Sequence, residues 1–296
     1  MTRIGIIGTG MLGNAVGLHI LESGYQLTVF NRTKSKTKDL ANHGAKVVNS
    51  PMDVSLASDL VFTIVKDANA VRDVSFGGKG IVEGKHKELI VADMSTINPN
   101  ASKEIAKKFS KYNITMLDTP VMGGPNVAIK GELVLMAAGD KKAFEKHKKE
   151  FETVANKTFF LGPNGTAHSV KLAMNLQIGM LALAISEGIT LARGAGIDPE
   201  VFLKILNSTN FKTGMSENKA YKMVENKFDP TFTLKNLKKD LDTINEAAKD
   251  FGLELPMTIK ANELYKNAVE NGFGDLDYTG ILAFLNQTTK LENRHK

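Results

Sequence analysis

Two polar side chains, Lys171 and Asn175, lie four residues apart at the start of a long apolar stretch. In an α-helix this spacing places both side chains on one face. Desolvation of a lysine ammonium is costly and would lower its pKa toward the range used in acid–base catalysis, so Lys171 is a candidate proton donor. A lysine near a helix end can equally extend its charged head to water, and the pair alone leaves both interpretations open.

A glycine-rich segment near the start of the chain reads Gly-Thr-Gly-Met-Leu-Gly over residues 8–13. It follows a predicted buried strand over residues 3–7 and precedes a helical pattern that ends at Gly24. In this context the first glycine permits a tight turn, the second lets backbone amides approach a pyrophosphate, and the third packs the helix against the strand. A second predicted strand, residues 26–30, completes a βαβ unit. We therefore predict a dinucleotide site, with a structural turn or an S-adenosylmethionine site as alternatives.

The residues after the second strand, Asn31, Arg32 and Thr33, bear on which dinucleotide is bound. An NAD-specific site usually offers a carboxylate to the ribose 2′-hydroxyl, and none stands here. Arg32 can instead pair with a 2′-phosphate through its planar guanidinium. The sequence therefore favours NADP(H), with NAD(H) possible. In the alternative interpretation Arg32 is a solvated loop residue and Thr33 only caps a helix.

Strand-like and helical patterns alternate up to about residue 162. This alternation predicts an α/β domain of the Rossmann type with a doubly wound, mainly parallel sheet. Helical patterns such as 99–112 and 141–155 separate the strands. The further predicted strands cover residues 46–48, 60–65, 89–94, 115–117, 133–138 and 158–161.

The β-branched runs disappear after residue 166, and helical patterns follow one another to the end of the chain. A length of 296 residues permits two domains. We predict an NADP-binding domain over residues 1–163 and an all-helical domain for substrate binding and dimerisation over 164–296, joined by a long helix. The predicted helices cover 167–196, 199–208, 216–225, 234–251, 257–271 and 281–285.

Composition argues against several kinds of site. The chain has no cysteine, and its 6 histidines show no metal-binding spacing, so we expect neither disulfides nor a metal site.

The net charge of +6 and pI near 9.2 would suit a nucleic-acid partner. However, the lysines are mixed with acidic residues, as in residues 140–150, and aromatic residues do not alternate with the basic ones. We expect no nucleic-acid partner, although the positive field would attract an anionic cofactor and substrate.

Membrane insertion and export are also not expected. The apolar run at residues 178–185 is flanked by charged and polar side chains and is too short to span a bilayer. The first strand begins at residue 3, which leaves no room for a signal peptide before it, so we expect a cytoplasmic protein. The small residues of the long helix suit close packing between helices or subunits.

Several motifs stand in a fixed order along the chain, and together they carry a resemblance. They are the glycine-rich segment, Asn31-Arg32-Thr33, the Asp-Met-Ser-Thr segment at 93–96, the Pro-Val-Met-Gly-Gly loop at 120–124, the Lys171/Asn175 pair, and Lys239-Asp240. Over essentially its whole length the chain resembles the β-hydroxyacid dehydrogenases. That family includes 3-hydroxyisobutyrate dehydrogenase, tartronate semialdehyde reductase and the glyoxylate/succinic semialdehyde reductases.

The resemblance implies roles for individual residues. Lys171 would be the general acid for aldehyde reduction and the base for alcohol oxidation, while hydride moves between the nicotinamide and the carbon that bears the oxygen. Asn175 would hold the substrate oxygen or orient the lysine. The substrate-binding residues would be Thr96, Met122, Gly123, Gly124, Phe232 and Asp240. The cofactor-binding residues would be Gly8, Thr9, Gly10, Met11, Leu12, Gly13, Asn31, Arg32, Thr33, Val65, Thr96 and Lys239.

Met122 departs from the family pattern, in which most members carry serine at this position. A thioether cannot donate a hydrogen bond, although it can pack against an apolar chain. The amides of Gly123 and Gly124 can still approach a carboxylate, because glycine lets the main chain come close to an anion. We therefore expect a small carboxylate-bearing aldehyde or hydroxy acid as the substrate, and the resemblance implies a homodimer or homotetramer.

Three other functions stay open as alternatives. A decarboxylating dehydrogenase of the 6-phosphogluconate type shares the early motifs but carries histidine where this chain has Met174. An imine reductase shares the architecture but typically lacks the lysine at Lys171. A sensor or structural module that binds the dinucleotide without turnover would not need the Lys171/Asn175 pair.

Overall fold

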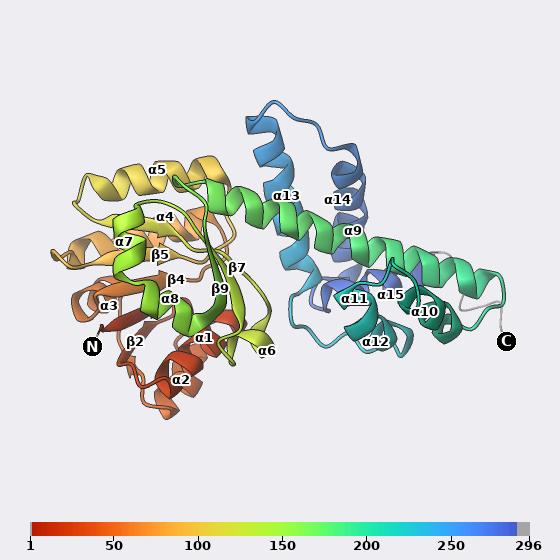
Figure 1. Cartoon of the computed structure of the whole chain (residues 1–296), viewed down its shortest axis with the longest axis horizontal. Helices are drawn as coiled ribbons and strands as arrows, with labels where there is room; N and C mark the ends of the chain where they lie inside the picture. The colour runs from red at the N-terminus through yellow and green to blue at the C-terminus, as the bar shows by residue number, and fades with distance from the viewer. Residues whose placement is uncertain (1, 289–296) are drawn as a thin grey trace. The chain divides into compact units, whose positions relative to one another are not determined.

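The computed structural model describes residues 2–288 and divides into two compact units, Met1–Leu172 and Ala173–Lys296 (Figure 1). The division lies later in the chain than the predicted domain boundary at 163/164. The reason is local, because the first turns of the long helix after Gly165 belong to the first unit. In these turns Ala167 joins a small apolar cluster with Met136 and Ala138, and His168 is fully buried.

The first unit is built on a six-stranded, all-parallel sheet with the strand order β3-β2-β1-β4-β5-β6. This order, with the chain winding outward from β1 in both directions, confirms the predicted doubly wound fold. Polar residues stand at the carboxyl ends of the central strands, which is where such sheets bind ligands. The strands are β1 (Ile4–Ile7), β2 (Leu27–Phe30), β3 (Lys46–Val47), β4 (Leu60–Thr63), β5 (Ile90–Asp93) and β6 (Thr115–Asp118).

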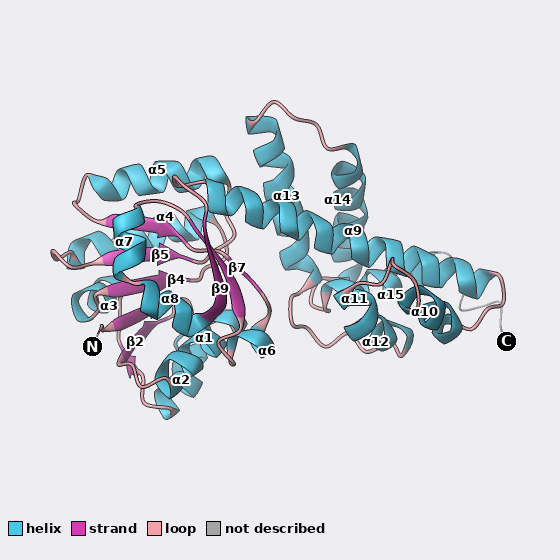
Figure 2. Cartoon of the chain, in the orientation of Figure 1, coloured by secondary structure: helices cyan, strands magenta, loops and turns pink. Residues whose placement is uncertain are grey.

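Helices cover both faces of this sheet, so its strands are apolar on both sides (Figure 2). Successive residues point to opposite faces: Val61 belongs to one core and its neighbour Phe62 to the other. The helical elements of the first unit are α1 (Met11–Glu22), η1 (Lys34–Thr37), α2 (Lys38–Asn42), α3 (Pro51–Ala57), α4 (Ala68–Phe76), η2 (Ile81–Gly84), α5 (Pro99–Ser110), α6 (Pro125–Ala128), α7 (Lys141–Lys146) and α8 (Lys148–Val154). The helix predicted over 141–155 is interrupted at His147.

A second, three-stranded sheet completes the first unit. It consists of β7 (Val121–Met122), β8 (Leu133–Ala137) and β9 (Ala155–Phe160), with β7 antiparallel and β9 parallel to β8. The sequence predicted β8 closely but not β7, which covers two residues between Pro120 and Gly123. Pairing of Met122 with Val134 fixes the residue that precedes the two glycines of the Pro-Val-Met-Gly-Gly loop at 120–124.

The second unit is all-helical, as predicted. The helix predicted over 216–225 is two helices that break at Lys219. The elements are α9 (Thr166–Gly194), α10 (Pro199–Asn207), α11 (Gly214–Asn218), α12 (Ala220–Val224), α13 (Leu234–Asp250), α14 (Pro256–Ala268), η3 (Val269–Phe273), η4 (Tyr278–Gly280) and α15 (Ile281–Thr288).

Helix α9 is 29 residues long, and by length and composition alone it could cross a membrane. The apolar run at residues 178–185 is one part of this longer helix, and the core helix of a folded protein meets the same criteria. Within the second unit the helix is packed by its neighbours: a methyl group on Gly179 would lie 3.4 Å from Leu241, and the Tyr265 hydroxyl donates a 3.3 Å hydrogen bond to the Gly179 carbonyl. The small residue at 179 thus permits close helix packing.

Candidate active site

In the glycine-rich loop between β1 and α1, the three glycines meet different steric constraints. Gly8 has φ +102°, and a side chain there would collide with the Ile64 carbonyl at 2.2 Å. A side chain on Gly13 would meet the Gly8 carbonyl at 2.0 Å, so the third glycine lets α1 pack against the loop. Gly10 is extended at the N-cap of α1 and has open space around its Cβ position. The loop therefore leaves a cradle at the N-terminus of α1, as an anionic pyrophosphate requires.

Asn31 at the end of β2 holds this loop in place. Its Oδ1 accepts a 3.0 Å hydrogen bond from the Thr9 backbone amide, and its Nδ2 donates to the Thr33 carbonyl at 2.9 Å. The Thr9 hydroxyl donates to the Lys36 carbonyl at 2.9 Å. Asn31 thus fixes the loop in addition to standing where the ribose is expected, and this contact could not be read from the sequence.

Arg32 is exposed directly after β2, and so are Lys34 and Lys36 in η1. The structure places three cations at the strand end where a dinucleotide carries its adenosine ribose. Sequence reasoning singled out Arg32 alone, although the alternation of lysines at 34 and 36 was visible. Cationic side chains of this kind can pair with a phosphate group.

Val65 and Thr96, both half-buried, follow the ends of β4 and β5. The two segments are joined by Ser95, whose hydroxyl accepts a 3.0 Å hydrogen bond from the Val65 amide. The remaining loop residues expected at the cofactor are accessible, with Met11 exposed and Leu12 half-buried at the start of α1. Adjacent strand ends thus place these residues at one edge of the sheet.

The two glycines after β7 differ in their constraints. Gly123 has φ +125°, and a side chain there would lie 2.7 Å from Leu133. Only glycine fits at this position without strain. Gly124 is extended and open, and it caps the short helix α6. The loop thus exposes main chain beside Met122, as close contact with a carboxylate requires.

Lys171 and Met122 are in direct contact within the first unit. The Lys171 Nζ donates to the Met122 sulfur at 3.3 Å, across 49 positions of sequence. Lys171 is half-buried rather than fully buried, and Met122 packs against the apolar cluster of Met136 and Ala167. The sequence predicted both residues for the site but not their contact. A thioether is a weak acceptor, so this partner holds the ammonium loosely.

Asn175, Lys239 and Asp240 come together within the second unit. The Asn175 Nδ2 donates a 2.6 Å hydrogen bond to Asp240 Oδ2, and the Lys239 Nζ lies 2.5 Å from Asp240 Oδ1. Asn175 and Asp240 are both buried. Among residues 2–288, no hydrogen-bond partner faces the buried Oδ1 of Asn175, which therefore keeps an acceptor available.

Phe232 is half-buried just before α13 and contacts Tyr278, which lies 46 positions later in the chain. Its ring packs edge-to-face on Tyr278 at a centroid distance of 6.1 Å, and its carbonyl accepts a 2.9 Å hydrogen bond from the Tyr278 amide. The Asp277 carboxylate accepts hydrogen bonds from the Lys219 ammonium and from the Thr231 amide. The segment that leads into Lys239-Asp240 is thus anchored by an ion pair whose carboxylate is buried.

Two family models match the chain in tandem. Residues 3–162 match the NAD-binding domain of 6-phosphogluconate dehydrogenase, and residues 165–285 match the NAD-binding domain of NADP-dependent 3-hydroxyisobutyrate dehydrogenase. The chain is also 31% identical over 280 residues to glyoxylate/succinic semialdehyde reductase 1 of Arabidopsis thaliana, covering 95% of this chain and 97% of that protein. The chain belongs to the β-hydroxyacid dehydrogenase family. It is accordingly an NAD(P)-dependent dehydrogenase or reductase.

Further relatives agree with this placement. A probable 3-hydroxyisobutyrate dehydrogenase-like protein of Arabidopsis thaliana is 35% identical over 290 residues, covering 96% of this chain and 85% of that protein. The solved structure of a 3-hydroxyisobutyrate dehydrogenase from Salmonella typhimurium superposes with a TM-score of 0.87 and 26% identity, covering 96% of this chain and 100% of that chain. This β-hydroxyacid dehydrogenase thus shares its whole described fold with the family.

Proposed function

We propose that this β-hydroxyacid dehydrogenase interconverts a small semialdehyde that bears a carboxylate and its hydroxy acid, with NADP(H) as cofactor and Lys171 as general acid and base. The observation that carries the proposal is the 3.3 Å contact between Lys171 Nζ and Met122, the residue that immediately precedes Gly123 and Gly124 in the chain. A proton donor beside an anion-binding loop suits an aldehyde with a carboxylate at its other end.

The cofactor would be held by residues that the structure brings to one edge of the sheet. They are the Gly8–Gly13 loop, Asn31, Arg32, Thr33, Val65 and Thr96. The NADP(H) nicotinamide supplies or accepts the hydride when it is bound. The protein's contribution is to position that ring and the substrate carbon and to handle the proton.

In the reductive direction Lys171 gives a proton to the substrate oxygen as the aldehyde carbon receives the hydride, so the C=O bond becomes a C–OH group. In the oxidative direction the neutral amine takes the proton back. Lys171 can leave the Met122 sulfur for a substrate oxygen at little cost, because an oxygen is the stronger acceptor. Within the second unit Asp240 fixes the orientation of the Asn175 amide, whose buried Oδ1 keeps an acceptor.

Met122 supports a narrower choice of substrate. A hydroxylated substrate would place an unpaired polar group against the thioether, at a cost of roughly 1–3 kcal/mol, whereas an alkyl chain gains contact there. Two relatives agree with this class by name, one a glyoxylate/succinic semialdehyde reductase and one a probable 3-hydroxyisobutyrate dehydrogenase. We propose an unsubstituted or alkyl-substituted semialdehyde.

A cofactor-oxidation screen tests the proposal. Glyoxylate, succinic, methylmalonate, malonate and tartronate semialdehydes are each offered with NADPH and with NADH, and the fall in absorbance is recorded. We expect turnover with NADPH and at least one unsubstituted or alkyl-substituted semialdehyde. Tight NADPH binding without oxidation of any of them would instead favour the alternative of a dinucleotide-binding module without turnover.

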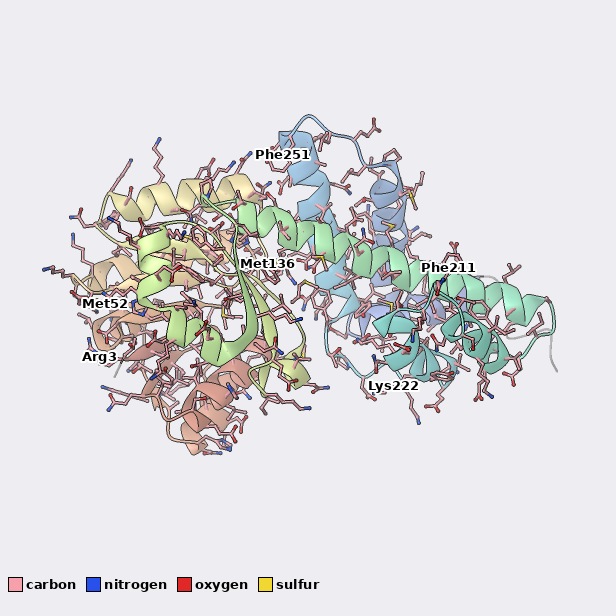
Figure 3. All side chains as sticks on the ribbon, in the orientation of Figure 1. Arg3, Met52, Met136, Phe211, Lys222 and Phe251 are labelled. Atoms are coloured by element: carbon pink, nitrogen blue, oxygen red, sulfur yellow. The ribbon has the colours of Figure 1, made fainter. Side chains whose placement is uncertain are left out.

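We propose a homodimer or homotetramer as the assembly, with a small molecule and no membrane or nucleic acid as the partner. The second unit exposes large apolar side chains, among them Leu191 at 76% and Phe211 at 80% exposure. Phe211 is labelled in Figure 3. Sedimentation velocity at two protein concentrations tests the assembly, and a monomer at both would contradict it.

A further inference from the structure

A group of buried polar side chains lies at the carboxyl ends of three neighbouring strands, beneath the proposed site. Thr63 ends β4, Asp93 ends β5 and Asp118 ends β6, and the three are adjacent in register. All three are fully buried. The Thr63 hydroxyl donates a 2.6 Å hydrogen bond to Asp93 Oδ1. Two carboxylates side by side in a protein interior need compensating donors or a cation.

Asp118 has its donors, and they tie the start of α9 to β6. Its Oδ1 accepts hydrogen bonds from the Ser102 hydroxyl at 2.6 Å and from Asn164 Nδ2 at 2.8 Å. Its Oδ2 accepts from the Gly165 amide at 2.5 Å, immediately before the helix. A carboxylate at this end of a helix is favourable both for the orphan amide and for the helix dipole.

Asp93 is compensated on one oxygen only. Its Oδ1 accepts from Thr63 and from the Ser95 amide at 3.3 Å, while no hydrogen bond reaches its Oδ2 from any described residue. Burial raises the pKa of Asp93, and the charge of His168 opposes that shift. The group that faces the free oxygen is the His168 imidazole, whose Nε2 lies 3.6 Å from Asp93 Oδ2.

His168 is as buried as the carboxylates, and Asp118 is its second carboxylate neighbour. Its Nε2 also lies 3.9 Å from Asp118 Oδ1, and neither ring nitrogen has a hydrogen bond within residues 2–288. Two buried carboxylates thus lie within 4 Å of one buried imidazole nitrogen, which is the polar contact between this turn of α9 and the ends of β5 and β6.

The position of His168 in α9 gives this contact a consequence. His168 precedes Lys171 by three residues, one turn of the same helix. A shift of this first turn would therefore move the Lys171 head relative to Met122. Asp93 also accepts a hydrogen bond from the amide of Ser95, the residue that precedes Thr96. One buried contact thus bears on both the proton donor and the strand end beside it.

We propose that His168 is a positioning residue: its contact with Asp93 fixes the first turn of α9 on the strand ends and so sets the place of Lys171 relative to Met122 and Thr96. The proposal rests on the function proposed for Lys171. It makes His168 act through Lys171, without touching substrate.

Two substitutions at 168 separate positioning from filling of space. Glutamine has about the reach of the imidazole and can donate to Asp93, whereas leucine fills the volume and cannot. We expect His168→Leu to lower kcat for semialdehyde reduction about ten- to hundredfold, with KM for NADPH within about twofold of the parent, because a small displacement of a catalytic group is costly. His168→Gln should return kcat to within about threefold of the parent.

His147 offers a matched control. It is also buried in the first unit and also lies near a carboxylate, with Nδ1 3.5 Å from Glu150 Oε2, but it sits at the break between α7 and α8. His147→Leu should lower the melting temperature while leaving kcat within about twofold of the parent. Equal loss of kcat in His168→Gln and His168→Leu, in step with their melting temperatures, would reduce His168 to a structural residue and overturn the proposal.

A second readout does not depend on turnover. Trace acetylation of the protein without cofactor, followed by mass spectrometry, gives the reactivity of Lys171 relative to the exposed Lys111. We expect this ratio to change at least about threefold in His168→Leu and to stay near the parent value in His168→Gln and His147→Leu. An unchanged ratio in His168→Leu would overturn the proposal. Failure of the parent to reduce any semialdehyde would instead refute the proposed function, and the labelling ratio would still decide on His168.

Discussion

The Nζ of Lys171 lies 3.3 Å from the sulfur of Met122, so the proposed proton donor meets a thioether where most of the family offers a hydroxyl. A hydroxyl can both donate and accept, whereas a thioether only accepts, and weakly. A substrate oxygen is therefore a stronger hydrogen-bond acceptor for the Lys171 ammonium than the Met122 sulfur is. The substrate in turn loses a donor near its carboxylate, which then depends on main-chain amides.

Removal of the Lys171 amine should abolish most of the chemistry. Lys171→Ala should lower kcat roughly a hundredfold to ten-thousandfold with cofactor affinity nearly unchanged, because general acid–base catalysis is lost while the dinucleotide contacts remain. Lys171→Arg should fail similarly, since a guanidinium does not give up its proton near neutrality. Steady-state kinetics and NADPH fluorescence titration measure the two quantities.

Lys111→Ala is the matched control for Lys171, because it removes an exposed lysine at the end of α5. Its kcat should equal that of the parent. Near-normal turnover of either Lys171 variant at neutral pH would show that the proton comes from another group.

Arg32 should set the cofactor preference. A charge-assisted pair with a 2′-phosphate is worth on the order of 1.5–3 kcal/mol, so NADPH should be preferred over NADH about ten- to hundredfold in kcat/KM. Arg32→Asp should reverse the preference by repelling the phosphate. Lys149→Asp, on the exposed face of α8, makes the same change of net charge and should leave the ratio alone. A parent enzyme that uses NADH equally well would leave Arg32 as a solvated loop residue.

The ion pair of Lys219 and Asp277 should stabilise the second unit in a pH-dependent way. Burial raises the pKa of Asp277, but hydrogen bonds from Lys219, Thr231 and Thr279 outweigh it, so the pKa lies below the ordinary value. A carboxyl group with a lowered pKa in the folded state adds stability that is present above the unfolded pKa of about 3.9. That stability is lost as the pH falls through the folded-state pKa.

The substitution Asp277→Asn should therefore lower the free energy of unfolding by about 1–3 kcal/mol at pH 7, because the half-buried Lys219 ammonium loses its carboxylate partner. The difference from the parent should shrink as the pH falls below about 4. Asp275→Asn breaks an exposed pair with Lys235 and should change stability by less than about 0.5 kcal/mol. Urea titrations across pH measure all three proteins. A difference that does not depend on pH would contradict the assignment.

Much of the fold could be predicted from local sequence patterns. The glycines at 8 and 13 are required by a positive φ and by a close approach that their spacing encodes, and the change from alternating to all-helical patterns marked the second unit. The predictions of secondary structure failed where contacts with other elements determine the local conformation. The breaks at His147 and Lys219 interrupt continuous helical patterns, and two-residue β7 exists only because β8 pairs with it.

The site was predictable by residue but not by contact. Lys171 and Met122 stand 49 positions apart, and Asn175 and Asp240 stand 65 apart, so no periodicity connects either pair. The role of Asn31 in holding the phosphate loop was missed for the same reason. His168 was missed although it stands one turn before Lys171, because a single histidine in a helix is usually a core or surface residue and only its burial between carboxylates sets it apart.

Met122 should decide between alkyl and hydroxylated substrates. The parent should show a higher kcat/KM for succinic or methylmalonate semialdehyde than for tartronate semialdehyde, since the thioether leaves a hydroxyl unpaired at a cost of roughly 1–3 kcal/mol. Met122→Ser should narrow that ratio about tenfold or more by raising activity on the polar acid. Met122→Leu keeps an apolar surface but removes the sulfur that accepts from Lys171, so it should preserve the preference for alkyl substrates. Met257→Ser, at an exposed position of α14, is the control and should change nothing. Should the parent already prefer tartronate semialdehyde, or Met122→Ser leave the ratio unchanged, then Met122 only packs against its cluster and selectivity must be sought at Thr96 and Phe232.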